Sequence, residues 1–408
     1  MRTARAKRPR VAVLSRNYPR AGAPWLGVYV AEQVRELCRH ADVRVVSPVS
    51  LTPPISELSG WMKEPGRVRS WLSSLKARGT ESKVLHPRWL PLPKRPFEFT
   101  EGIWLAGVFL RALRGLKRKG WSPNLLHAHF VYPDGLAAVL VGRLLELPVV
   151  VTAHGSDLKL LPQRSRALRE QVGWTLQKAQ AVICVSAELR GLALTYGARP
   201  DFTRVIPNGY DPEAFRPIPQ KAARETLGLR GDTRILLYAG NLYPVKGPDL
   251  LLQSYSRLNG WRSRSRLVLV GEGFWRARLE EQARRLGLAA RVRFAGARPH
   301  EEMPRWLAAA DVVVLPSRSE GWPTVVVEAL AVGRPVVATR VGAVPEMVRD
   351  GKNGFVVESA EPGALADALT AALEKSWDAE EISRSAPLLT WTEVAERIAS
   401  IYQEIVGK

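Results

Sequence analysis

The chain has 408 residues, of which 46% are hydrophobic and 24% are charged. This is the composition of a globular protein with enough apolar residues for more than one core, so it excludes bulk disorder, a collagen-like fibre and a small disulfide scaffold. The net charge of +21 lies almost entirely in residues 1–200, which hold 32 Lys and Arg against 13 Asp and Glu, whereas residues 201–408 hold 28 against 26.

This asymmetry predicts that the first half of the chain meets an anionic surface. Composition alone leaves three candidate partners: nucleic acid, an anionic membrane and an acidic substrate. Cys38 and Cys184 lack CxxC spacing, which excludes a thiolate metal site and favours a reducing compartment. No apolar run reaches the roughly 18 residues that a spanning helix needs, and no signal peptide is visible. We therefore expect a cytoplasmic protein, soluble or peripheral on the inner face of the cell membrane.

The first half, after a basic tail at residues 1–10, alternates predicted strands with predicted helices. Uninterrupted Val and Ile runs are typical of strands buried on both faces, as in a parallel sheet. The pattern predicts a doubly wound α/β domain over residues 11–205. The expected strands are at 11–14, 43–46, 125–128, 149–153 and 181–186, and the expected helices are near 134–145 and 164–177.

Residues 52–121 differ from the rest of this domain. They contain many prolines, several tryptophans and an excess of Lys and Arg. We interpret them as a basic Trp- and Pro-rich insertion, partly amphipathic helix and partly loop.

A segment dense in Pro, Asn and Gly at 206–220 predicts an interdomain linker. The alternating pattern then restarts and predicts a second α/β domain over residues 221–389. Residues 390–408 predict a terminal helix, opened by Thr390 and Glu393 at capping-box spacing. The expected strands of the second domain are at 234–239, 267–270, 292–295, 311–315, 336–339 and 354–357, and the expected helices begin at 248, 277, 303 and 324.

The most specific motif follows the strand at 311–315. The chain turns at Gly321 and Pro323 and begins a helix for which Thr324 is the expected N-cap. Free N–H groups at such a helix start suit a diphosphate. Glu328 lies about 6 Å along the helix, within reach of a ribose, and Glu320 faces the end where a sugar sits. The alternative is a pair of solvated glutamates.

Two further strand ends carry candidate ligand groups. Lys246 lies at the start of the helix at 248, where the helix dipole disfavours a positive charge. An anion bound between the lysine and the helix start would explain its position. The alternative is an exposed lysine in a turn. His154 follows the strand at 149–153, where open α/β sheets bind ligands, although a structural histidine is equally compatible. His127 and His129 are expected to face opposite sides of their strand and to form a poor metal pair.

Two glycine-containing loops give weaker signals. Gly271 and Gly273 form a lone GxG that lacks the third glycine of a dinucleotide fingerprint. The loop at 15–27 ends in a helix that starts near Gly27, and its amides can meet a phosphate; the alternative is a flexible loop.

Taken together, these stretches resemble the family-4 retaining glycosyltransferases, which share the GT-B architecture of two Rossmann-like, doubly wound parallel-sheet domains facing a central cleft. The resemblance extends from Asn17-Tyr-Pro19 to the terminal helix. The segments Tyr132-Pro-Asp-Gly135 and Thr152-Ala-His-Gly155 look most like bacterial cell-envelope members of the teichuronic-acid-biosynthesis type.

The resemblance implies roles for the residues named above. Glu320, Lys246 and His154 would be catalytic, with Lys246 on the diphosphate and the other two at the sugar, and Glu328 would bind the ribose. Residues 205–211 would be the crossover between domains, and the final helix would return to the first domain. The other implied donor-binding positions are Gly240, Asn241, Gly271, Gly273, Arg318, Pro323, Thr324 and Val325; Gly27 and Asp157 would belong to acceptor or phosphate loops.

The sequence departs from the family pattern at two positions. Asn241 stands where the family usually has a second phosphate-binding arginine, so Lys246 carries more of the charge or Arg318 substitutes for it. Pro323 stands where many members have glycine, and proline fits the start of a helix.

The implied function is transfer of a sugar, with retention, from a UDP- or GDP-sugar to a cell-envelope glycan or a lipid-linked, anionic acceptor. The resemblance implies a hexosyltransferase that needs no metal or other cofactor, and the sequence has no DxD pair in a glycine-rich loop. The basic first domain would dock on the membrane. The alternatives are a nucleotide-sugar epimerase on the same fold, or a basic membrane- or nucleic-acid-binding protein without activity; the sequence has no nucleic-acid-binding motif, so no nucleic-acid partner is expected.

Overall fold

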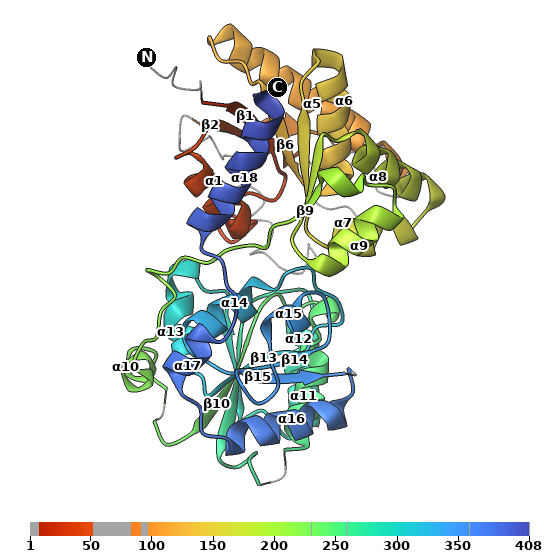
Figure 1. Ribbon diagram of the computed structural model, residues 1–408. Helices are drawn as coiled ribbons and strands as arrows, with labels where there is room; N and C mark the ends of the chain where they lie inside the picture. The colour runs from red at the N-terminus through yellow and green to blue at the C-terminus, as the bar shows by residue number, and fades with distance from the viewer. Residues whose placement is uncertain are drawn as a thin grey trace, which may run out of the picture. The chain divides into compact units, whose positions relative to one another are not determined.

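The computed structural model describes residues 8–51, 83–90, 97–229, 231–258, 260–358 and 360–407. These residues form two compact units (Figure 1). Unit 1 holds the described residues up to Asn208 together with those from Trp391 onward, and unit 2 is Gly209–Thr390. Most of the basic tail at 1–10 and much of the insertion at 52–121 lie outside the described residues.

Unit 1 is built on a seven-stranded sheet in which every neighbouring pair is parallel. All residues of three of these strands, β6 (Leu125–His129), β7 (Val149–Ala153) and β8 (Ala181–Cys184), are buried, as expected for strands covered on both faces. Its order is β4 (Val84–Leu85), β2 (Asp42–Val46), β1 (Arg10–Leu14), β6 (Leu125–His129), β7 (Val149–Ala153), β8 (Ala181–Cys184) and β9 (Thr203–Val205), and β3 (Val49–Ser50) pairs separately with β5 (Arg88–Trp89).

The helices of unit 1 follow from capping residues and apolar stripes. Ser165 and Ser186 cap α8 and α9, because each hydroxyl accepts a hydrogen bond from the amide three residues on. The last helix, α18, packs on α1 (Figure 1). The helices are α1 (Val28–Leu37), α5 (Glu101–Arg118), α6 (Leu136–Leu145), α7 (Ser156–Lys159), α8 (Arg166–Lys178), α9 (Ala187–Thr195) and α18 (Trp391–Val406).

Unit 2 has a six-stranded parallel sheet covered by helices. The strand order is β12 (Val292–Gly296), β11 (Ser265–Val270), β10 (Arg234–Ala239), β13 (Val312–Leu315), β14 (Val336–Thr339) and β15 (Gly354–Val357). The helices are α10 (Gln220–Thr226), α11 (Pro248–Ser256), α12 (Arg276–Arg285), α13 (Met303–Ala309), α14 (Thr324–Ala331), α15 (Val344–Met347), α16 (Pro362–Glu374) and α17 (Ala379–Arg384).

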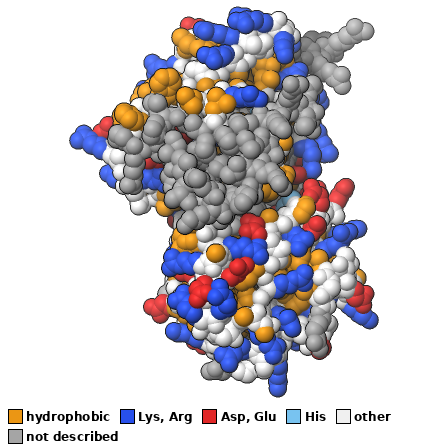
Figure 2. Space-filling view, turned by 180° about the vertical axis from the view of Figure 1, so that it is seen from behind, with side chains coloured by type: hydrophobic (Ala, Val, Ile, Leu, Met, Phe, Trp, Pro, Cys, Tyr) orange, Lys and Arg blue, Asp and Glu red, His pale blue; other side chains and the backbone are white. Residues whose placement is uncertain are grey.

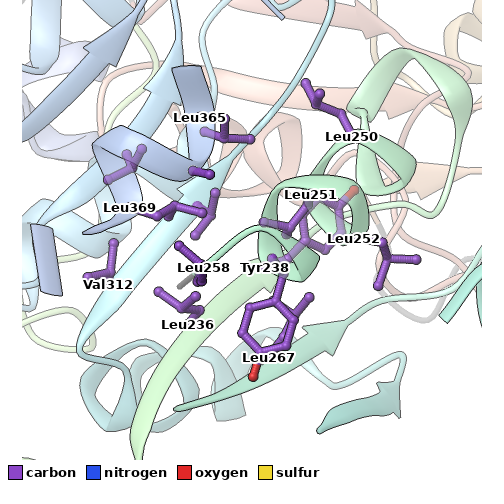
Figure 3. Packing of buried hydrophobic residues seen from close by; sticks show 14 of the residues in the cluster. Leu236, Tyr238, Leu250, Leu251, Leu252, Leu258, Leu267, Val312, Leu365 and Leu369 are labelled. Atoms are coloured by element: carbon purple, nitrogen blue, oxygen red, sulfur yellow. The ribbon is translucent and has the colours of Figure 1, made fainter. Parts of the chain in front are cut away.

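One core of unit 2 joins its sheet to two helices (Figure 3). Leu236 and Tyr238 project from β10, and they pack with Leu251 of α11 and with Leu365 and Leu369 of α16. All five side chains are buried, so this core fixes the strands whose ends carry the candidate site.

The predicted fold class is confirmed, since both units are α/β with parallel sheets. The expected strands at 149–153, 234–239, 336–339 and 354–357 have the predicted bounds. The prediction that Thr324 caps α14 is wrong: Pro323 occupies the N-cap in extended backbone, and no side chain caps the helix. Within the described residues, no helix combines the length and apolarity needed to cross a membrane.

Candidate active site

The carboxyl ends of β10 and β11 approach each other so closely that only glycine fits there. A Cβ on Gly271, whose φ is 143°, would lie 1.9 Å from the carbonyl oxygen of Gly240. A Cβ on Gly273 would lie 2.5 Å from the carbonyl oxygen of Leu242. The lone GxG is therefore a packing requirement that holds the two loops of this edge together.

Lys246 and Glu320 form an ion pair between the loops that follow β10 and β13. The ammonium lies 2.8 Å from each carboxylate oxygen, and the hydroxyl of Ser317 donates to Oε1 of Glu320 at 2.6 Å. Glu320 is only 8% exposed, so these contacts compensate a nearly buried charge. Gly247 adopts a left-handed conformation with φ of 64°, and a Cβ there would lie 1.9 Å from the carbonyl oxygen of Pro316, which brings the two loops together.

Glu328 lies one turn into α14 and pairs with His300. Nε2 of His300 is 2.9 Å from Oε1 of Glu328, and the two residues are 28 positions apart. The sequence analysis did not single out His300, because no local pattern links it to Glu328. The amides of Thr324 and Val325 lie in the first turn of α14, where N–H groups have no acceptor within the helix. This helix start therefore offers donors to an anion.

Asn241 stands where the family usually has an arginine, and Arg318 is the candidate substitute for that cation; the two residues differ in what they contact. The Arg318 guanidinium donates two hydrogen bonds to Asp249, both at 2.8 Å, and one to the carbonyl of Pro244 at 2.5 Å. Hydrogen bonding to Asp249 raises the pKa of Arg318. Asn241 is exposed, and its carbonyl accepts from the hydroxyl of Tyr238 at 2.7 Å. Arg318 is thus engaged in holding the loop to α11.

In unit 1, the loop at 15–27 carries two arginines. Arg16 donates through its amide and its Nε to Asp134, at 2.9 and 3.1 Å, and also pairs with Glu101. Burial and the neighbouring charge of Arg16 lower the pKa of Arg20. The Nε of Arg20 is buried without a hydrogen-bond partner among the described residues. Gly27 ends the loop with φ of 63°, and a Cβ there would lie 2.0 Å from the carbonyl oxygen of Asn17.

His154 belongs to a row of three histidines at the ends of β6 and β7. Nε2 of His154 is 3.0 Å from Nδ1 of His129, whose ring stacks on that of His127 with centroids 4.6 Å apart. The prediction that His127 and His129 face opposite sides is wrong, because residues two apart on a strand share a face. His127 is held by Thr152 at 2.7 Å and by the hydroxyl of Tyr402 at 2.6 Å.

The hydrogen bonds of this row determine which nitrogen of His154 carries the proton. Burial lowers the pKa of His127 and of His154 to about 3 and that of His129 well below its usual range, so all three rings are neutral at pH 7. Nε2 of His129 is buried without a partner in the described part of the chain. We assign the proton of His129 to Nδ1, since a proton on Nε2 would bury an unpaired donor. His154 then accepts at Nε2 and carries an N–H at Nδ1.

Asp157 is fully buried and holds the backbone next to His154. Its carboxylate accepts hydrogen bonds from the amides of Val131 at 2.8 Å, Gly155 at 2.7 Å and His154 at 3.2 Å. Burial raises the pKa of Asp157, and these amide bonds oppose the shift. Asp157 therefore shapes the loop that presents His154.

The described residues contain no group of three or more His, Cys, Asp or Glu side chains that is arranged to hold a metal ion. Cys38 and Cys184 are both free thiols. The groups available for chemistry are thus one lysine, two glutamates and the first amides of α14 in unit 2, and separately the three histidines in unit 1.

Comparison with known proteins assigns both units to one class of enzyme. The family described as Glycosyltransferase Family 4 matches residues 26–214, and the family described as Glycosyl transferases group 1 matches residues 219–388. A D-inositol 3-phosphate glycosyltransferase of Acidothermus cellulolyticus is 31% identical over 406 residues, which cover 94% of this chain and 86% of that protein. Another of the same name, from Thermobispora bispora, is 35% identical over 339 residues, covering 77% and 79%.

Solved structures share the fold. Anabaena HepE in complex with UDP-glucose has a TM-score of 0.72 at 19% identity, covering 97% of this chain and all of that one. Sucrose-phosphate synthase from Thermosynechococcus elongatus has a TM-score of 0.74 at 22% identity, with coverage of 98% and 100%. The names of these relatives do not refer to teichuronic acid. On the strength of these matches, the chain belongs to the family-4 glycosyltransferases and has the GT-B fold.

Proposed function

We propose that this chain transfers a hexose from a UDP-sugar, with retention of configuration, to a phosphorylated acceptor. The observation that carries the proposal is the grouping of Lys246, Glu320 and the start of α14 at the carboxyl edge of the unit 2 sheet. Ligands of open α/β sheets bind at this edge. The UDP complexes of a structural neighbour support the choice of base.

The donor diphosphate binds the first amides of α14 and draws Lys246 toward it. Those amides and the ammonium stabilise the negative charge that develops on the leaving UDP, and they are in place before the reaction begins. Glu328 accepts hydrogen bonds from the ribose hydroxyls in place of its present contact with His300. Glu320 and the Nδ1–H of His154 act on the sugar.

Variants at two positions test the donor assignment. We expect Glu328→Gln and Lys246→Gln each to weaken UDP binding by about tenfold or more, which corresponds to about 1.4 kcal/mol. The matched control is Lys352→Gln, which removes an exposed lysine of the same unit. Calorimetric titration of UDP measures the effect, and melting temperatures check that each variant is folded. Unchanged affinity in both variants would contradict these assignments.

The reaction requires no metal ion in this proposal, because amides and Lys246 supply the electrostatic stabilisation. Treatment with EDTA should leave the transfer rate unchanged, and a loss restored by a divalent cation would contradict this part. Incubation with a UDP-sugar and no acceptor separates the enzyme from an epimerase. An epimerase would release an isomerised nucleotide sugar, whereas a transferase leaves the donor intact or hydrolyses it slowly.

The acceptor carries a phosphate that meets Arg20 in the loop at 15–27. The support is the buried Nε of this arginine, which has no hydrogen-bond partner among the residues described and lies beside the charge of Arg16, together with the name of the relatives, D-inositol 3-phosphate glycosyltransferase. D-inositol 3-phosphate and a lipid-linked diphosphate acceptor are the two candidates to compare. Equal rates of transfer to inositol and to D-inositol 3-phosphate, in the wild type and in Arg20→Ala alike, would count against an anionic acceptor.

The protein works at the cytoplasmic face of the membrane, on which unit 1 docks. Helix α5 exposes Ile103 and Trp104, which are 57% and 54% exposed, and its exposed face continues with Arg111 and Arg114. Hydrophobic side chains lie among lysines and arginines on the surface of unit 1 in Figure 2. This combination suits an anionic lipid surface, because apolar side chains insert while cations meet headgroups.

Liposome flotation tests the docking. Binding should require anionic lipid and decrease with salt, and the double variant Ile103→Ser and Trp104→Ser should lower the bound fraction several-fold. Phe274→Ser is the matched control, since Phe274 is an exposed aromatic side chain of unit 2. Binding that is indifferent to lipid charge and to the α5 substitutions would remove this part of the proposal.

A further inference from the structure

Unit 2 has a cavity of about 670 Å³ at the amino-terminal edge of its sheet. Its wall includes Arg234, the first residue of β10, and Asp311, which precedes β13. Lys246 follows the opposite end of β10. Because a strand rises about 3.3 Å per residue and β10 has 6 residues, the cavity lies roughly 20 Å from the candidate active site.

The cavity is lined by more positive than negative side chains. Two aspartates, Asp232 and Asp311, face five arginines, which are Arg224, Arg234, Arg264, Arg266 and Arg291. The lining therefore carries a net charge of +3 at neutral pH. Residues 201–408 as a whole are nearly balanced, with 28 Lys and Arg against 26 Asp and Glu, so the excess is local.

Two of the arginines are part of the wall. Asp311 accepts hydrogen bonds from Arg224 at 2.5 Å, from Arg234 at 2.8 Å and from the amide of Ile235 at 2.6 Å. Arg224 is buried and also donates to the carbonyls of Ala309 and Gly231. The carboxylate of Asp311 is thus paired with Arg224 and Arg234, and none of its three hydrogen bonds comes from Arg264, Arg266 or Arg291.

The remaining three arginines keep their donors for a ligand. The side chains of Arg264, Arg266 and Arg291 make no hydrogen bond or ion pair with the residues that the structure describes. Arg266 and Arg291 lie at neighbouring positions of two paired strands, because Leu267 pairs with Val292 in the parallel register of β11 and β12 and the amide of Leu267 donates to the carbonyl of Arg291 at 3.0 Å.

We infer that this cavity is a second anion site, which binds a phosphate-bearing molecule through Arg264, Arg266 and Arg291. A phosphomonoester carries a charge of about −1.5 to −2 at pH 7 and offers three acceptor oxygens, which guanidinium groups bind in pairs. Trp261 also lines the cavity and adds an aromatic side chain to its wall. The volume lies within the range of sites for small metabolites.

Calorimetric titration tests this inference on the full chain with UDP present at saturation, so that the candidate donor site is occupied. Inorganic phosphate and a hexose 6-phosphate are the probes. We expect the double variant Arg266→Ala and Arg291→Ala to weaken binding of the hexose phosphate by about tenfold or more. The matched control is Arg305→Ala, which removes an exposed arginine of α13 that does not line the cavity.

The outcomes answer two separate questions: whether the three arginines bind phosphate at all, and whether that phosphate belongs to a soluble molecule or to a lipid. Vesicles that contain phosphatidylglycerol are the third probe. If the wild type binds these vesicles, the double variant does not, and neither soluble probe binds, the ligand of the same three arginines is a lipid headgroup. Equal affinity for every probe in the wild type, double variant and control, or no binding at roughly 10 mM of any of them, would overturn the inference. Affinity for UDP, measured separately, reports on the donor site alone.

Discussion

The ring of His129 is fully buried, and within the described part of the chain only its Nδ1 has a hydrogen-bond partner. We expect this bond to hold His154 in the tautomer with the proton on Nδ1. Replacing His129 by Leu removes the donor, so His154 is free to take the other tautomer and to turn. The expected result is a loss of about tenfold in kcat/KM for transfer, on the scale of one hydrogen bond of about 1.4 kcal/mol, with affinity for UDP unchanged.

The variant His129→Asn separates positioning from packing. Its amide nitrogen lies near the place of Nδ1 and can donate to His154, so it should recover most of the activity that Leu loses. Nitrogen NMR of labelled histidine reports the tautomer of His154 directly. Equal activity of the Leu and Asn variants, or an unchanged tautomer in His129→Leu, would show that His129 does not position His154.

Gly247 connects the loop of Lys246 to the loop of Glu320. An alanine there would need φ of 64° and would place its Cβ 1.9 Å from a backbone oxygen of Pro316. We expect Gly247→Ala to separate the two loops, to lower the stability of unit 2 by at least about 2 kcal/mol and to weaken UDP binding. Gly287 has nearly the same φ of 68° with open space around it, so Gly287→Ala should cost only about 1 kcal/mol. Urea titrations compare the two, and equal losses would contradict the role of the close approach.

At the scale of elements, a buried hydrogen bond ties α18 to the sheet of unit 1. The hydroxyl of Tyr402 lies 2.6 Å from Nδ1 of His127, and both residues are fully buried. Tyr402→Phe removes the hydroxyl and leaves the ring nitrogen without a partner, which should lower the free energy of unfolding by about 1–3 kcal/mol. The control is Tyr196→Phe, at a partly exposed tyrosine of the same unit. A loss no larger than that of the control, in urea titrations, would show that this hydrogen bond does not stabilise the docking of α18.

The elements also show what the sequence could predict. The runs of β7, β10 and β14 are buried along nearly their whole length, so their apolar pattern is continuous and their bounds were predictable. The strands β3, β4 and β5 have two residues each, which is too short for any pattern. The N-cap of α14 was mispredicted because the backbone already turns at Pro323, so Thr324 enters the helix without capping it.

The sequence predicts which residues belong to the candidate site better than it predicts the contacts between them. Glu320, Glu328 and Lys246 were found because each follows a strand or lies near a helix start, where local sequence signals a ligand edge. The partner of Glu328, His300, comes from the loop after β12, and only the strand order brings the two together. The arginines of the cavity in unit 2 likewise come from separate strand starts, so their convergence is a property of topology.

At the scale of the whole molecule, the row of histidines in unit 1 makes stability depend on pH. Burial holds the pKa of His127 and of His154 at about 3, whereas an unfolded chain binds a proton at the ordinary pKa of about 6.5. Between these two values only the unfolded state gains the proton. Stability contributed by each ring is therefore fully present above pH 6.5 and is lost as the pH falls through 6.5 toward 3.

We expect His127 alone to account for about 2 kcal/mol of lost stability between pH 7 and pH 5. The variant His127→Gln keeps a polar group near Thr152 but does not titrate, so its urea midpoint should fall less than that of the wild type over this interval. His40→Gln, at a partly exposed histidine in the turn after α1, is the control and should follow the wild type. Because carboxylates titrate alike in all three proteins, the difference between the variants isolates the histidine. If His127→Gln loses as much stability as the wild type, its ring is not held neutral in the folded chain, and the proton assignment that orients His154 loses its basis.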